Sequence, residues 1–579
     1  MTLSARLADL REEMQAGDPS THLHALFDAI WEHRIESEPE LATYLGEPGP
    51  THRWTDHSLE AFDRRKDDAV AALEALRAVD PAALDDVDRT SLRLAIYEHQ
   101  QQVDRAQFPY EFLAASTMEG PQVDIPQVMS LMPARTIGDL EDVVARLSGV
   151  SVYIDQTIAL LDEGRAAGVT IPRVVAEQVA PSVGSLVEAP AAESPLLLPF
   201  ESSPDGIDPS DVDDLRAEAL EAVTSATSAL RRFAAYLDET YVPSCRETTA
   251  FTALPDGDEW YAQLVRHETT TEVTPAEIHA IGVDEVARIR KEMESVITST
   301  GYSGSFAGFA ELLRTDKRFY FDTAEALLAH YRDIAKRADA ELPRLFGLLP
   351  RLPYGVKAVP EHEAPTAPAA FYLPGSIELG RPGWFCANTY DLDARPTYEM
   401  EATCLHEGVP GHHMQIAIAA ELEGLPKFRT KSWAYTAYVE GWGLYAESLG
   451  AEMGFYSDPY NRFGQLSSEL WRAIRLVVDT GMHALGWSRE RAIDYCVENS
   501  TATMHEIRSE IDRYLSIPGQ ALTYKLGELT IQRLRREASA ALGSGFDLRS
   551  FHDLMLGAGP LPLDVLEERT RAWINHRDG

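Results

Sequence analysis

A proline and a glycine interrupt a histidine-rich stretch in the second half of the chain. The stretch reads Cys404-Leu405-His406-Glu407-Gly408-Val409-Pro410-Gly411-His412-His413-Met414-Gln415. Proline removes a backbone donor and crowds the preceding turn, and glycine readily adopts positive φ, so a straight helix cannot pass through this pair. We therefore expect one helix to end near Glu407 and a second helix to begin near His412.

The histidines on either side of this break are candidate metal ligands. Zinc binds imidazole nitrogen and carboxylate oxygen, and a His-Glu pair followed by another His can supply two ligands and a general base. Pro410 occupies the usual i+4 position of the second histidine. In a straight helix His412 would lie about 120° around the axis from His406, and His413 would lie about 10 Å further along. We predict His406 and His412 as ligands, with His413 as the alternative, and Glu407 as the general base.

The same block resembles a known family. In the family called domain of unknown function 885, which contains predicted zinc peptidases of the gluzincin type, the hallmark is His-Glu-x-x-Pro-Gly-His-x-x-Gln. This chain matches it at His406, Glu407, Pro410, Gly411, His412 and Gln415. Further matching stretches are Arg381-Pro382-Gly383, Asn388-Thr389, Val439-Glu440-Gly441-Trp442, Leu476–His483, Arg513-Tyr514 and Pro518–Lys525.

The resemblance implies a third ligand downstream of the histidines and places it on Glu440. The neighbours of Glu440 are apolar or small, and a buried carboxylate is costly unless it binds something. A surface or ion-paired role is the alternative. Glu447, seven residues further on, shares its helix face and is a candidate to support the ligands. We expect one Zn²⁺ per chain, although ligand type alone does not separate zinc from manganese or cobalt.

Three further residues are candidates for catalysis because they lie in the matching stretches. An oxyanion needs a donor besides the metal, and Tyr524 is the first choice, with Tyr514 or His483 as the second. Arg475, Asp479 and His483 recur every four residues. They form a stripe that is either a ladder of helix ion pairs or a set in which Asp479 orients His483.

Three residues are candidates for substrate binding. Arg513 and Lys525 could bind a substrate carboxylate, which would make the protein a carboxypeptidase, or could simply pair with Glu510 or Asp512. Asn388 could contact the substrate backbone, and a turn-forming asparagine is the alternative.

Charge and composition limit the partners. The 579 residues carry a formal net charge of −40, which opposes binding to nucleic acid and to anionic membrane surfaces. The sequence has no apolar run long enough to span a membrane, and its first residues are too charged for a signal peptide. The four cysteines are far apart, as expected for reduced thiols. These features predict a cytoplasmic protein and leave its oligomeric state open.

The periodicity of apolar residues predicts a mainly α-helical protein. Residues 1–260 read as helices that we expect to flank or roof a deep cleft, and residues 261–579 as a zinc-peptidase-like region. Short β-leaning segments at 354–359, 369–373 and 383–390 predict a small sheet just before the metal helix. The predicted function is zinc-dependent hydrolysis of short peptides, by a carboxypeptidase or an oligopeptidase. A zinc amidase acting on a non-peptide amide and a helical binding or scaffold protein are the alternatives.

Overall fold

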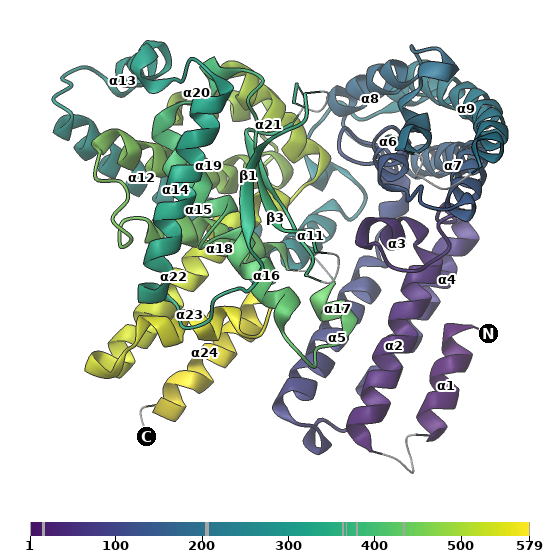
Figure 1. Ribbon diagram of the computed structural model, residues 1–579, viewed down its shortest axis with the longest axis horizontal. Helices are drawn as coiled ribbons and strands as arrows, with labels where there is room; N and C mark the ends of the chain where they lie inside the picture. The colour runs from purple at the N-terminus through teal and green to yellow at the C-terminus, as the bar shows by residue number, and fades with distance from the viewer. Residues whose placement is uncertain are drawn as a thin grey trace. The chain divides into compact units, whose positions relative to one another are not determined.

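The computed structural model describes residues 2–13, 18–202, 208–361, 364–365, 367–377, 380–431 and 435–577. The protein is mainly α-helical, with one small three-stranded mixed sheet (Figure 1). The chain forms two compact units. Unit 1 comprises Met1–Gln263, Pro426–Lys431 and Asp512–Ile517, and unit 2 comprises Leu264–Leu425, Ser432–Ile511 and Pro518–Gly579. Two short segments of the predicted C-terminal region thus belong to unit 1.

Unit 1 is built from helices joined by short connections. Their bounds are α1 Leu3–Glu13, α2 Pro19–Ser37, α3 Pro39–Leu45, α4 Leu59–Arg77, α5 Asp86–Arg105, α6 Pro121–Leu131, α7 Ile137–Ala167, α8 Arg173–Leu186, α9 Pro209–Tyr236, α10 Val242–Ser244 and α17 Lys427–Thr430. The longest of them, α7, begins with a capping box in which Thr136 and Asp139 satisfy each other's backbone N–H groups. Two helices, α11 Gly257–Thr269 and α21 Met504–Ser516, contribute residues to both units.

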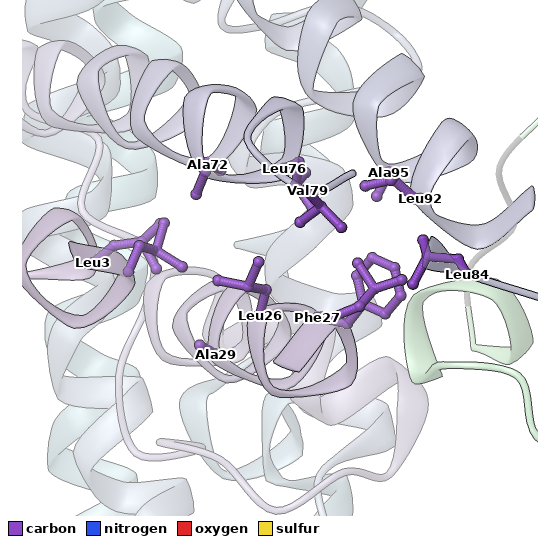
Figure 2. Close-up of a cluster of buried hydrophobic side chains, with 13 residues drawn as sticks. Leu3, Leu26, Phe27, Ala29, Ala72, Leu76, Val79, Leu84, Leu92 and Ala95 are labelled. Carbon is purple, nitrogen blue, oxygen red and sulfur yellow. The ribbon is translucent and has the colours of Figure 1, made fainter. Parts of the chain in front are cut away.

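A cluster of buried apolar side chains holds the first helices of unit 1 together. Leu26 and Phe27 of α2 face Leu76 of α4, and Leu3 of α1 and Leu92 of α5 extend the cluster (Figure 2). Each side chain of this size contributes roughly 1.5–3 kcal/mol when fully buried. The cluster therefore makes α1, α2, α4 and α5 one packed body.

Unit 2 contains the remaining helices and the sheet. The helices are α12 Pro275–Ser299, α13 Phe306–Thr315, α14 Ala324–Leu345, α15 Met400–Glu407, α16 His412–Glu421, α18 Thr436–Leu449, α19 Pro459–His483, α20 Arg489–Asn499, α22 Thr523–Leu542, α23 Leu548–Leu556 and α24 Leu563–Arg577. Helix α12 begins with a second capping box, between Thr274 and Glu277. The pattern Thr-Pro-Ala-Glu predicts this start, because proline suits the first helical position and glutamate reaches back to the cap.

The sheet has the strand order β1-β3-β2, so that β1 and β2 are its edges. The strands are β1 Tyr354–Ala358, β2 Ala370–Leu373 and β3 Gly383–Ala387. β1 runs parallel to β3, with Val356 opposite Phe385, and β2 runs antiparallel to β3, with Tyr372 opposite Phe385. The sheet packs on α14 and α15, as expected for a sheet next to the metal helix.

The predicted break between the two histidines is present. Helix α15 ends at Glu407 and α16 begins at His412. A Cβ atom on Gly411 would overlap the carbonyl oxygen of His406, so only glycine allows the chain to fold back this tightly. The break turns His412 toward His406.

The structure also bears on two predictions, that the cysteines are reduced and that the chain has no membrane-spanning segment. All four cysteines, Cys245, Cys386, Cys404 and Cys496, are buried and free. Among the described residues, none of the helices combines the length and apolar character needed to cross a membrane.

Candidate metal centre

Two imidazoles and one carboxylate converge in unit 2. His406 comes from the last turn of α15, His412 from the start of α16, and Glu440 from α18. The Nε2 atoms of His406 and His412 each lie 3.5 Å from Oε2 of Glu440, and the three ligand atoms lie within 4.8 Å of one another. The two imidazole rings are nearly perpendicular, with an angle of 86° between their planes.

This geometry fits a single metal ion. Zinc bonds of about 2.0–2.2 Å in a tetrahedron place the ligand atoms about 3.4 Å apart, which is close to the two measured separations of 3.5 Å. The side chains of His406, His412 and Glu440 are 6%, 11% and 19% exposed. The three ligands are thus shielded, with Glu440 the most accessible of them.

Carboxylates flank His406 on both sides. Its Nδ1 lies 2.8 Å from Oε1 of the buried Glu447, also on α18, while its Nε2 faces Glu440. Burial alone would lower the pKa of His406, but hydrogen bonds to Glu440 and Glu447 raise it to about 10. The same negative field favours a metal cation at this position.

The charge of Glu440 is also stabilised. Burial would raise the pKa of this carboxyl, but His412 and His406 hold it well below its usual range. Glu440 is therefore a carboxylate at neutral pH, as a metal ligand must be. Gln415 supports the second histidine: its Nε2 lies 2.9 Å from Nδ1 of His412 and donates to the carbonyl of Val439 at 2.8 Å.

His413, the alternative ligand, points into the contact between α16 and the sheet. Its Nδ1 lies 2.9 Å from the hydroxyl of Tyr372 on β2, and its ring lies 4.4 Å from that of Tyr354 on β1. Burial lowers the pKa of His413 to about 4, so this histidine is neutral. The structure therefore groups His412, and not His413, with His406 and Glu440.

Glu407, the predicted general base, follows His406 directly at the end of α15. It is only half-buried, whereas His406 is buried. Loss of hydration through burial raises the pKa of the Glu407 carboxyl, and the nearby His412 and His406 partly offset this effect. The chain thus places a fourth titratable group beside the triad, with access to solvent.

The two other predicted catalytic residues lie on neighbouring helices. Tyr524 is the second residue of α22, and the guanidinium carbon of Arg475 lies 4.6 Å from its ring centroid. His483 ends α19 and is completely buried. On the same helix, Asp479 accepts a hydrogen bond from the backbone N–H of Gly519. The catalytic roles of Tyr524 and His483 stay predictions.

Lys525 has three carboxylate partners and no exposed side-chain surface. Its Nζ lies 2.8 Å from Glu469, 2.8 Å from Glu528 and 3.0 Å from Glu285. Burial would lower the pKa of Lys525, but the three carboxylates raise it above its ordinary value. These contacts favour an internal ion network between α12, α19 and α22 over the predicted binding of a substrate carboxylate.

The other two predicted substrate-binding residues also have partners within the protein. Asn388 is buried, and its amide donates to the carbonyls of Ala364 and Ala367 while its oxygen accepts from the N–H of Tyr390. These contacts favour the turn-forming alternative, and a role of Asn388 in substrate binding stays a prediction. Arg513 lies in the segment of α21 that belongs to unit 1, with its guanidinium carbon 4.9 Å from the ring centroid of Tyr514. Its role in substrate binding stays a prediction.

Two further residues of α18 shape the site: Gly443, which the sequence did not single out, and Trp442, which belongs to a family-matching stretch. A Cβ on Gly443 would come within 2.7–3.1 Å of three atoms of the His406 ring. The glycine on α18 therefore leaves room for the imidazole of His406, which comes from α15. Trp442 donates from Nε1 to the carbonyl of Pro410 at 2.8 Å and ties the break to the same helix. A small residue three positions after a candidate ligand is too common to predict such a role.

Comparisons with known proteins identify the family and the fold. The family described as bacterial protein of unknown function (DUF885) matches residues 39–570. A comparison with curated proteins finds no match. A solved structure from Colwellia psychrerythraea, described as a "putative lipoprotein", is 27% identical, with a TM-score of 0.89, and the match covers 96% of this chain and 100% of that one.

A second solved structure shows the same fold at lower identity. It is described as a "putative lipoprotein of unknown function" from Shewanella oneidensis. It is 16% identical, with a TM-score of 0.76, and the match covers 94% of this chain and 98% of that one. Because the family match spans most of the sequence, this chain belongs to the DUF885 family of bacterial proteins of unknown function.

Proposed function

We propose that this protein is a zinc-dependent peptidase that cleaves short peptides. The observation that carries the proposal is the convergence of His406, His412 and Glu440 at distances suited to one ion, with Glu407 next to the first ligand. Two histidines and one glutamate are the ligand set of zinc peptidases, and three protein ligands leave a position for water. Structural zinc sites usually have four protein ligands.

Each residue of the site then has a defined task. A bound zinc ion would polarise the scissile carbonyl and lower the pKa of a water molecule. His406, His412 and Glu440 would hold the ion, and Glu447 would orient His406 through Nδ1. Glu407 would accept a proton from the attacking water and pass it to the leaving amine. Tyr524 is the proposed donor to the oxyanion.

The position of the edge strand β2 is an argument for a peptide as the substrate. It borders the sheet on the side away from β1 and packs on α15, which carries His406. An extended peptide can add to such an edge as one more strand. We propose that short peptides bind in this way, within the cleft expected from the sequence.

The test compares the full-length protein with two variants. Wild-type protein loaded with zinc is assayed on a panel of peptides with free and blocked termini, and metal content is measured for every sample. Glu407→Gln should keep its zinc and lose about 10²–10⁴-fold in kcat. Glu423→Gln, which changes an exposed glutamate in the loop after α16, is the matched control and should keep full activity.

Two results would contradict the proposal. Full hydrolysis by Glu407→Gln would exclude Glu407 as the general base. Wild-type protein that holds zinc but cleaves no peptide would favour a binding or scaffold protein. The location in the cell stays a prediction. Cell fractionation distinguishes the cytoplasm expected from the sequence from the cell envelope, which the descriptions of the two solved structures suggest for those proteins.

A further inference from the structure

Unit 1 contains a cavity of its own, independent of the metal centre. Its volume is about 670 Å³, within the range of small-molecule sites. All the residues that line it belong to unit 1. They come from α1, α2, α4, α5, α6, α7 and α17 and from the connections between these helices. The proposed peptidase reaction uses none of them.

One wall of the cavity is apolar. Leu3, Phe27, Ala72 and Ala95 line it and belong to the buried cluster that joins the first helices (Figure 2). Phe428 of α17 packs against this cluster and also lines the cavity. Such a wall favours the hydrocarbon or aromatic part of a ligand.

Two arginines that line the cavity, Arg65 half-buried and Arg105 exposed, each lie over an aromatic ring. The guanidinium carbon of Arg65 is 4.2 Å from the ring centroid of Phe62, and that of Arg105 is 4.1 Å from the ring centroid of Tyr110. Within the described part of the chain, neither arginine has a carboxylate at salt-bridge distance. Arg65 gives one N–H to the carbonyl of Asp56. Stacking uses the face of a guanidinium and leaves its N–H edge for a carboxylate.

Several other charged groups of the lining are matched within the protein. Their hydrogen-bonded or ion-paired partners are Lys66 with Glu111 at 3.0 Å, Arg34 with Glu38 at 3.2 Å, His33 with Asp68 at 2.9 Å, and Tyr153 with Asp124 at 2.6 Å. Burial lowers the pKa of His57 to about 4, so it adds no charge at neutral pH. Arg65 and Arg105 have no such direct ion pair among the described residues, although Glu38, Asp56 and Glu111 act on the charge of Arg65 from farther away.

Two acidic groups of the lining, Glu98 and Glu119, lie outside these pairs and oppose an anion. Glu119 has no side-chain hydrogen bond among the described residues, and it lies close enough to Arg105 to interact with its charge. Burial raises the pKa of Glu119, and Arg105 partly offsets this effect. A raised pKa means that the carboxyl takes up a proton more readily, so it opposes a bound anion less than an exposed glutamate would.

We propose that this cavity binds an amphipathic carboxylate, a molecule with an apolar aliphatic or aromatic body and one carboxylate group. The N–H edges of Arg65 and Arg105 receive the carboxylate, and the wall formed by Leu3, Phe27 and Ala72 receives the body. This site is separate from the proposed peptidase function and does not depend on it.

The test uses three probes of one size and different charge on the full-length protein. 4-Phenylbutyrate, 4-phenylbutanol and 4-phenylbutylamine are titrated at neutral pH by calorimetry. The acid should bind at least about tenfold more tightly than the alcohol, because charge-assisted hydrogen bonds to arginine are worth about 1.5–3 kcal/mol. The amine should bind most weakly. Acid no tighter than alcohol, preferred binding of the amine, or no binding of the acid up to about 1 mM would overturn the proposal.

Variants then locate the binding in the cavity. Arg65→Gln and Arg105→Gln should each weaken the acid several-fold and leave the alcohol unchanged. Arg64→Gln is the matched control, because Arg64 neighbours Arg65 on α4 but does not line the cavity. If Arg65→Gln fails to fold, Arg105→Gln alone tests the assignment. The Arg105 side chain makes no hydrogen bond within the described residues, so its replacement should not prevent folding. Acid affinity equal to wild type in Arg105→Gln would overturn the assignment, and tighter acid binding in Glu119→Gln would support it.

Discussion

Nδ1 of His406 lies 2.8 Å from Oε1 of Glu447 in the interior of unit 2. Nε2 of the same ring faces Glu440, so His406 bridges the proposed ion and a second carboxylate. A carboxylate on Nδ1 fixes the orientation and tautomer of a metal-binding histidine and makes its other nitrogen a better ligand. We therefore expect Glu447 to act as a positioning residue for the metal centre.

Replacing this carboxylate should weaken metal binding. Glu447→Gln keeps the shape and an oxygen acceptor but removes the charge, so zinc affinity should fall about 10–100-fold. Competition with a chromophoric chelator measures the effect. Glu452→Gln, which alters a glutamate paired with Arg535 at the surface, is the control. Equal zinc affinity in Glu447→Gln and the control would contradict this role.

The two adjacent histidines of α16 should differ sharply in their effects. His412→Gln should abolish stoichiometric zinc binding, because it removes one of three ligands. His413→Gln should keep the zinc and lose about 1–3 kcal/mol of unfolding free energy, because the hydroxyl of Tyr372 loses its buried partner. Elemental analysis and denaturant unfolding of both variants measure these outcomes. Metal loss in His413→Gln alone would reverse the assignment.

The sequence predicted the local features of the metal site because they depend on neighbouring residues. Pro410 and Gly411 interrupt a straight helix, and the rise per residue of a helix favours His412 over His413 as the second ligand. The sequence left His413 as the alternative, and the three-dimensional grouping decides between them. Short β-leaning segments marked the three strands within a few residues. Glu440 followed from the family pattern rather than from any spacing.

Features that depend on distant contacts could not be predicted. The partners of Lys525 are Glu285, Glu469 and Glu528, and two of them lie far away in the sequence. Until those partners are known, binding of a substrate carboxylate and pairing within the protein are equally plausible roles for a lysine in a family-matching stretch. The cavity of unit 1 is lined by seven helices, and no local pattern reveals such a space.

The ion network around Lys525 predicts a loss of stability. Lys525→Met would leave Glu528 without a cation and would leave Glu285 and Glu469 with Arg288 alone. Removing one partner of a buried ion pair typically costs about 3–5 kcal/mol. Lys336→Met changes a lysine whose side chain is 84% exposed, and its effect should stay within about 0.5 kcal/mol. Urea unfolding of both variants measures the difference. Unchanged stability with a raised KM in Lys525→Met would instead support binding of a substrate carboxylate.

Buried neutral histidines predict a loss of stability in acid, and His552 gives the clearest case. It is fully buried, with Nδ1 2.8 Å from the carbonyl of Leu345 and Nε2 2.8 Å from the hydroxyl of Tyr445. Burial lowers its pKa from 6.5 to about 4. Below pH 6.5 the unfolded chain therefore binds a proton that the folded protein does not, so the stability due to neutral His552 is present above pH 6.5 and is lost as the pH falls toward 4.

The measurement compares unfolding free energies at pH 7 and pH 4.5. His552→Gln should lower stability at pH 7, because the glutamine cannot reproduce both hydrogen bonds. The further loss between pH 7 and pH 4.5 should be smaller than in wild type by about 2–3 kcal/mol, because the variant no longer carries this titrating group. His576→Gln, at an exposed position of α24, should keep the wild-type dependence. The same dependence in all three proteins would show that His552 is not held neutral by the fold.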